Sequence, residues 1–282
     1  MMLLSLRLLS RLPLALLHAL GAFAGVLAYA AVPGFRRKTR DNLETAGLYS
    51  RSLAWRSAAH AGMGTLELAW VWFRPLAQVL ALTDARQLGP ATDGAAANGR
   101  IFLTPHIGCF ELSAKAFSTF APMTIIYKAP RRDDLHRLLQ RARAHPGLTF
   151  VPADASGVRA LFKALRRGEA IGILPDQVPT VGEGEWAPFF GRPAFTMTLA
   201  SRLAERSGAA VYMLASWRLP RAAGWRIDVR PIDDTPTPER INREVEAIVR
   251  IDPRQYYWSY NRFKVPQGSL PAAAGLVDGA GA

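Results

Sequence analysis

The residues best suited to chemistry lie together in the segment TPHIGCFEL, residues 104–112. His106 follows a short apolar run, and Glu111 comes five residues later, where a helix is expected to begin. Five residues turn a helix by about 140°, so the two side chains can meet only if His106 lies in the turn before it. A carboxylate beside a histidine fixes the imidazole tautomer and stabilises the imidazolium, as a general base requires. The segment therefore predicts His106 as a base with Glu111 as its partner.

Other features of the same segment limit the kinds of reaction that it could catalyse. Gly108 permits a tight turn, and backbone N–H groups at the start of the helix could bind an oxyanion. Cys109 is the only cysteine, which excludes an intrachain disulfide, and its apolar neighbours favour inert packing over a nucleophile. No G-x-S-x-G elbow lies near a strand end, so the base is expected to activate a substrate hydroxyl. A buried or capping histidine is the alternative, because H-x4-E alone occurs by chance in many proteins.

Alternating strands and helices must position these residues. Short apolar runs are followed by amphipathic stretches of about 10–15 residues, which favours an α/β fold with a mixed, largely parallel sheet flanked by helices. Residues 83–99 are polar and glycine-rich and are expected to form a loop, and Ser156 is a candidate N-cap. Strands are expected at 101–104, 123–127, 148–152, 170–174, 209–216 and 224–231, and helices at 50–82 with a break at Pro75, 109–119, 133–144, 156–167, 196–207 and 238–250.

The N-terminal part is a candidate membrane anchor. Residues 12–32 are predominantly apolar, and about 20 such residues can span a bilayer. A secretory signal peptide is the alternative, but the run is long, and the basic residues at 36–40 would hinder export. The same basic flank favours a cytoplasmic position for the rest of the chain. A helix lying in the bilayer interface also fits, because Pro13 weakens a straight span.

The composition is at once apolar and basic. The 282 residues include 35 Lys+Arg against 22 Asp+Glu, a net charge of +13, and 50% are hydrophobic. This content suffices for a packed core and excludes disorder for most of the chain. The charge predicts an acidic partner, and nucleic acid is the least favoured because no nucleic-acid motif is recognised. We expect a membrane anchor with its basic flank over 1–40, a catalytic domain over 41–266 and a disordered tail over 267–282.

Several further blocks of sequence resemble the late acyltransferases of lipid A biosynthesis, within the glycerolipid acyltransferase superfamily. His106 and Glu111 match the H-x4-D/E motif of that superfamily. The blocks follow the order of the family and extend, with the N-terminal anchor, to about Val265. They are residues 64–70, 127–131, 168–177, 187–194 and 252–264.

The resemblance implies a membrane-bound O-acyltransferase. It would move a fatty acyl chain from an acyl-carrier-protein thioester to a hydroxyl of a lipid A precursor, at the cytoplasmic face of the bacterial inner membrane. It implies His106 as general base with Glu111, and substrate-binding residues at Arg143 and Asp176. The predicted mechanism needs no metal ion and no cofactor.

A basic run completes the set of predicted site residues. Lys128 and Arg131 are expected to bind phosphates of the acceptor or the acidic surface of the carrier. Two alternatives remain open at this point. One is an acyltransferase for another amphiphile, such as a lysophospholipid, an ornithine lipid or a glycolipid mannoside. The other is a membrane-anchored nucleic-acid-binding protein.

Overall fold

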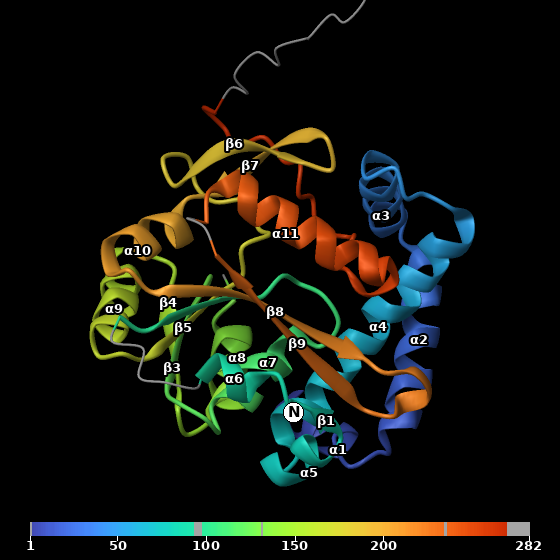
Figure 1. Cartoon of the computed structure of the whole chain (residues 1–282). Helices are drawn as coiled ribbons and strands as arrows, with labels where there is room; N and C mark the ends of the chain where they lie inside the picture. Colours follow the sequence, from blue (N-terminus) through green and yellow to red (C-terminus); the bar gives the residue numbers. More distant parts are fainter. Residues whose placement is uncertain (1, 93–97, 131, 234–235, 270–282) are drawn as a thin grey trace, which may run out of the picture.

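The computed structural model describes residues 2–92, 98–130, 132–233 and 236–269 (Figure 1). Within these residues the centre is a seven-stranded sheet, and its strands are parallel except for one antiparallel pair, β8–β9. The predicted mixed, largely parallel sheet flanked by helices is thereby confirmed. In spatial order the strands are β1 (Thr83–Asp84), β9 (Trp225–Ile232), β8 (Ala210–Arg218), β2 (Arg100–Leu103), β5 (Ala170–Ile173), β3 (Met123–Tyr127) and β4 (Leu148–Pro152).

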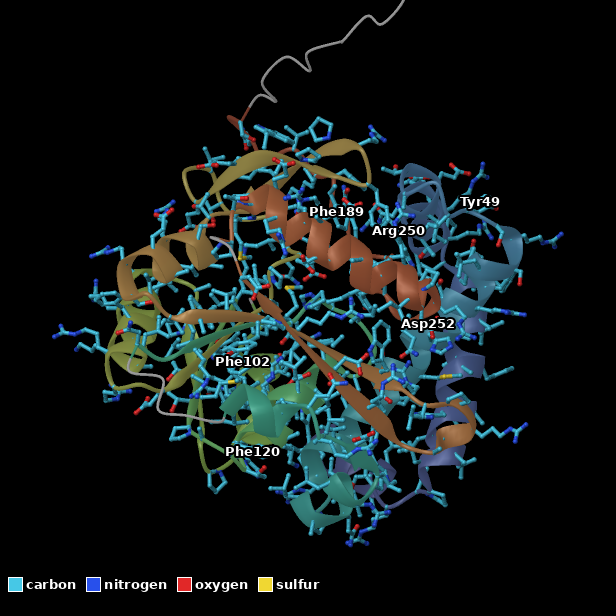
Figure 2. All side chains as sticks on the ribbon, viewed as in Figure 1. Tyr49, Phe102, Phe120, Phe189, Arg250 and Asp252 are labelled. Atoms are coloured by element: carbon cyan, nitrogen blue, oxygen red, sulfur yellow. The ribbon has the colours of Figure 1, made fainter. Side chains whose placement is uncertain are left out.

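Helices cover both faces of the sheet, because successive side chains of a strand point to opposite faces. Ile101 and Leu103 of β2 belong to one hydrophobic cluster, together with residues of α9 (Ala155–Arg166), α10 (Leu199–Ser207) and α11 (Pro238–Ile251). Phe102 between them belongs to a second cluster with α4 (Arg51–Phe73) and α7 (Phe110–Phe117), and Figure 2 shows it in the interior of the molecule. Further helices are α1 (Met2–Leu9), α2 (Leu14–Ala31), α3 (Pro33–Thr45), α5 (Leu76–Ala81), α6 (Leu88–Thr92) and α8 (Asp133–Arg143).

Helix α2 packs against α4 at a very short distance. A Cβ on Gly25 would lie 2.1 Å from the carbonyl oxygen of Ala58, and a Cβ on Gly62 would lie 1.9 Å from that of Gly21. Only glycine lets the two backbones approach so closely. The other side of α2 carries exposed apolar side chains, of which Phe23 is 69% exposed. In the described ranges, α2 is the one helix long and apolar enough to cross a membrane.

A buried ion pair joins these helices to the sheet. Glu67 of α4 is fully buried, and its carboxylate accepts a hydrogen bond from Arg218 Nε of β8 at 2.9 Å. Trp225 Nε1 of β9 donates to it at 3.1 Å, and Nε2 of His18 on α2 lies 3.0 Å away. Burial alone would raise the pKa of Glu67, but Arg218 and His18 outweigh it and lower the pKa to about 2. One ionised carboxylate therefore connects α2, α4, β8 and β9.

The structure differs from the sequence-based expectations at the edges of the sheet. The expected loop at 83–99 contains β1, which pairs with β9, and the short helix α6. The N-cap of α9 is Asp154, because its carboxylate accepts from the N–H groups of Ser156 and Gly157. Residues 196–198, expected to begin a helix, complete or follow the hairpin β6 (Gly184–Phe189)–β7 (Arg192–Met197), and α10 begins only at Leu199. Most of the predicted tail, residues 270–282, lies outside the described residues.

Candidate active site

His106 lies beyond the carboxyl end of β2, in a turn that two neighbouring segments hold in place. The N–H of Gly108 donates to the backbone oxygen of Gln255 at 3.0 Å, and that of Cys109 donates to the backbone oxygen of Ser216 at 2.8 Å. Gly108 has a φ of +55°, and a Cβ there would lie 1.9 Å from the Ser216 oxygen, so the turn requires glycine. Because both N–H groups are already bonded, neither is free to bind an oxyanion.

The side chain that holds the imidazole of His106 is Asp176. Nδ1 of His106 lies 2.7 Å from Oδ1 of Asp176, and the backbone N–H of His106 donates to Oδ2 at 2.9 Å. Asp176 follows β5 and is buried. Burial by itself would raise the pKa of this carboxyl, but the charge of His106 and both hydrogen bonds outweigh burial and lower the pKa. With Asp176 ionised, Nδ1 carries the proton and Nε2 is the basic nitrogen.

The basic nitrogen of His106 is in contact with a side-chain amide. Nε2 of His106 lies 3.1 Å from Nε2 of Gln177, whose N–H donates to the unprotonated ring nitrogen. Both residues line the same cavity. A hydroxyl that gives its proton to Nε2 must take the place of this amide. Gln177 was not among the predicted site residues, although it stands beside Asp176 in the block 168–177.

Glu111 pairs with Arg143 and not with His106. Its carboxylate, in the first turn of α7, accepts from Arg143 Nε at 3.1 Å and also from Arg143 Nη2. Trp72 Nε1 of α4 donates to it at 3.2 Å. Among the described residues no hydrogen bond joins Glu111 to His106, so the predicted partner of the imidazole is corrected to Asp176. The turn at Gly108 separates the two side chains: His106 reaches the end of β5, while Glu111 reaches α4 and α8.

Arg143, the last residue of α8, is held on several sides. Its guanidinium lies over the rings of Tyr127 and Phe150, 5.7 Å and 5.4 Å from their centroids. The pair with Glu111 is largely buried, since the two side chains are only 17% and 10% exposed. A bidentate pair fixes the orientation of the guanidinium. Its Nη1 group has no hydrogen-bond partner in the part of the chain that the structure describes, and so remains available to a substrate.

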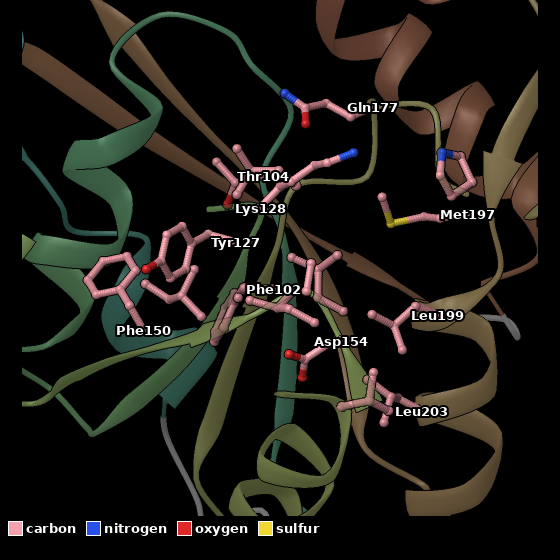
Figure 3. A pocket seen from close by; sticks show the side chains of 18 of the residues that line it. Phe102, Thr104, Tyr127, Lys128, Phe150, Asp154, Gln177, Met197, Leu199 and Leu203 are labelled. Atoms are coloured by element: carbon pink, nitrogen blue, oxygen red, sulfur yellow. The ribbon is translucent and has the colours of Figure 1, made fainter. Parts of the chain in front are cut away.

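These residues face a large cavity. His106, Glu111 and Arg143 line a space of about 910 Å³. Figure 3 shows Tyr127 and Phe150 on one side of it and Leu199 and Leu203 of α10 on the other. Mainly apolar walls with a few converging polar groups are typical of a ligand site. Further apolar lining residues are Phe102, Met123, Ile125, Val158, Phe162, Met197 and Leu214.

The remaining predicted residues have different surroundings. Lys128 is exposed and lines the cavity, whereas Arg131 lies outside the described residues. Cys109 is 1% exposed, and burial together with the charge of Glu67 raises the pKa of its thiol. A buried, protonated thiol is a poor nucleophile, in agreement with the predicted packing role. No group of three or more His, Cys, Asp or Glu side chains in the described residues is placed to hold a metal ion.

Comparison with known proteins gives the same kind of protein over nearly the whole chain. Residues 1–265 match the family described as bacterial lipid A biosynthesis acyltransferase. The lipid A biosynthesis lauroyltransferase of Escherichia coli K12 is 26% identical over 279 residues, which cover 93% of this chain and 90% of that protein. The lipid A biosynthesis palmitoleoyltransferase of the same organism is 27% identical over 212 residues, or 72% of this chain and 68% of that protein.

Proposed function

Because the chain belongs to the bacterial lipid A biosynthesis acyltransferase family, and is therefore an acyltransferase, we propose that it acylates a hydroxyl of a lipid A precursor with a fatty acyl chain from an acyl-carrier-protein thioester. One observation carries the proposal: His106, whose imidazole is held by Asp176, lines a large, mainly apolar cavity. Acyl transfer to a hydroxyl needs a base for the hydroxyl proton and an apolar space for the chain. Both requirements are met at one place.

The catalytic step follows from the tautomer of His106. Nε2 takes the proton of the acceptor hydroxyl as its oxygen attacks the carbonyl carbon of the thioester. Asp176 stabilises the resulting imidazolium through Nδ1. The carbon–sulfur bond then breaks, and the imidazolium returns the proton to the departing thiolate. The products are the ester and the free thiol of the carrier.

Arg143 is proposed to stabilise the negative charge on the thioester carbonyl oxygen. The two N–H groups of the turn are occupied, while the Nη1 donors of Arg143 remain available within the described residues. Preorganised donors of this kind are usually the largest electrostatic contribution to acyl transfer. Glu111 is then a positioning residue, because it acts by fixing the guanidinium. Glu111 would therefore still be required for activity, by holding Arg143 and not His106.

The acceptor and the membrane are proposed to meet the protein at separate places. Lys128 at the cavity and Arg131 nearby in the sequence would bind phosphate groups of the acceptor. Helices α1 and α2 carry exposed leucine and phenylalanine side chains, and α3 carries exposed basic residues. Such a combination favours contact with an anionic bilayer. We assign this contact to the cytoplasmic face of the inner membrane, with residues 1–40 as the anchor.

The test is a transfer assay with the full chain in detergent. Acyl-carrier-protein thioester is mixed with a Kdo-bearing lipid A precursor, and the mass of the product is measured by mass spectrometry. A mass gain of one acyl chain is expected, and His106→Ala should reduce its rate by about 10²–10⁴-fold. Product formed only on a lysophospholipid or another amphiphile would refute the acceptor. An unchanged rate in His106→Ala would refute the base.

A further inference from the structure

Helices α9 and α10 present a cluster of basic side chains at the cavity. Residues spaced by three or four share one side of a helix. This spacing places three cations together on α9 and two together on α10, and the two helices contact each other. All five are exposed and line the cavity described above. They are Arg159, Lys163 and Arg166 on α9, and Arg202 and Arg206 on α10; we call them the α9–α10 basic surface.

The positive charges of this surface are not neutralised by ion pairs among the residues that the structure describes. No salt bridge joins any of the five side chains to a carboxylate within the described part of the chain. Arg202 donates to the hydroxyl of Thr198, and Arg206 lies over the ring of Phe162. Seven cations and three acidic residues line the cavity as a whole. Two of those acids are engaged elsewhere, Glu111 with Arg143 and Asp154 as the cap of α9.

We infer that the α9–α10 basic surface docks the acidic carrier protein that delivers the acyl thioester. The inference rests on the proposed function and adds the place where the donor binds. A protein rich in Asp and Glu side chains would meet five unpaired cations, and complementary charge accelerates and orients such an encounter. The acyl chain would enter past Phe162, Leu199 and Leu203, which line the cavity from the same two helices.

The position of the surface favours a soluble acidic protein over lipid headgroups. The exposed apolar side chains of the N-terminal helices include Leu4, Leu20, Phe23 and Leu27. In Figure 1, α2 lies at the right of the molecule, and α9 and α10 lie at the left. With α2 against a bilayer, the basic surface is on the side away from the membrane. A water-soluble carrier can reach it there.

The experiment compares two matched pairs of charge reversals. Arg159→Glu with Lys163→Glu changes the α9–α10 basic surface. Arg137→Glu with Arg141→Glu is the control, because these are also exposed basic residues four positions apart on one helix, but they do not line the cavity. Within each pair the like-charge repulsion on the helix is the same before and after reversal. The milder Arg159→Gln with Lys163→Gln replaces the first pair if it fails to fold.

Three readouts separate docking from chemistry. The first is the KM for the acyl carrier, which should rise about ten-fold or more in the surface variant, with kcat and the KM for the acceptor unchanged. The second is the rate with an uncharged small thioester of the same acyl chain, which should not change. Binding of the carrier without its acyl chain, followed by fluorescence anisotropy, should weaken in parallel and depend less on salt than in the wild type.

Each other result overturns the inference. A raised KM for the acceptor would assign the surface to lipid phosphates. An equal rise in the KM for the carrier in both double variants would mean that the overall charge of the protein, and not this surface, determines binding. An unchanged KM for the carrier would exclude docking at α9. A wild-type protein that transfers from the small thioester but neither uses nor binds the carrier would refute the donor in the proposed function as well. That result is visible without any variant.

Discussion

Replacing Asp176 by asparagine tests the assignment of the imidazole partner. Asp176→Asn keeps the shape of the side chain and removes its negative charge. Where the carboxylate accepts from Nδ1–H, the amide can donate to Nδ1, which moves the ring proton to Nε2. His106 would then present a donor to the acceptor hydroxyl instead of a base. The variant therefore loses both the tautomer and the stabilisation of the imidazolium.

The size of the effect follows from the geometry. Oδ1 lies 2.7 Å from Nδ1, and Asp176 is buried, so salt screens the pair little. With charge centres about 4 Å apart and an effective dielectric constant of about 20, the attraction is about 4 kcal/mol. Since about 1.4 kcal/mol corresponds to a ten-fold change in rate, the expected loss in kcat is roughly a thousand-fold.

The assay measures single-turnover formation of the acylated lipid by mass spectrometry at saturating donor and acceptor. Asp228→Asn is the matched control, because Asp228 also holds a basic and an aromatic side chain, Arg226 and Trp217, but neither of these lines the cavity as His106 does. It should retain the wild-type rate. Thermal unfolding of both variants shows whether they are folded. A folded Asp176→Asn protein within about three-fold of the wild-type rate would refute the reasoning.

Three further outcomes are expected. Cys109→Ala should keep the transfer rate within about two-fold, and a large loss would reveal a nucleophilic thiol. Gly62→Ala should lower the free energy of unfolding by about 1–3 kcal/mol, because its Cβ meets the α2 backbone, whereas Gly34→Ala, with nothing within 4 Å, should not; equal melting temperatures would contradict the close packing. Glu67→Gln should lower the free energy of unfolding by about 3–5 kcal/mol, because it leaves Arg218 without its charged partner. Since folding lowers the pKa of Glu67 from 4.5 to about 2, its contribution is present above pH 4.5 and lost as the pH falls toward 2, and urea unfolding of the Gln variant should lack that acid-side loss.

Local sequence patterns predicted the central part of the fold. The strands at 123–127 and 148–152 have the predicted bounds, because β-branched and apolar residues in a short run favour a strand there. The two-residue strand β1 carries no such pattern. It exists because Leu82 and Thr83 lie beside β9, a contact between positions about 140 residues apart. Contacts of this kind are invisible to local spacing.

The site residues were likewise predicted one by one, whereas the contacts between those distant in sequence were not. His106 was identified from its position after a strand, and the family resemblance implied Asp176 as a substrate-binding residue. Their pairing was not predicted, because 70 residues separate them and only the adjacency of β2 and β5 brings them together. Glu111 was assigned to the histidine nearest in sequence. Its actual partner, Arg143, comes from the end of a helix 32 residues away.

The close contact between α2 and α4 has a consequence for producing the protein. Residues of α2 supply one wall of the interior: Leu17 is fully buried, and His18 is bonded to the carboxylate of Glu67. Cutting the chain after Ala31 to obtain a soluble form would uncover the glycine-containing side of α4 and leave that carboxylate short of a partner. A form that dissolves without detergent should instead be sought by making the outward side chains of α2, such as Phe23 and Leu27, polar while the inward ones stay. The helix proposed as the membrane anchor is thus also part of the folded core.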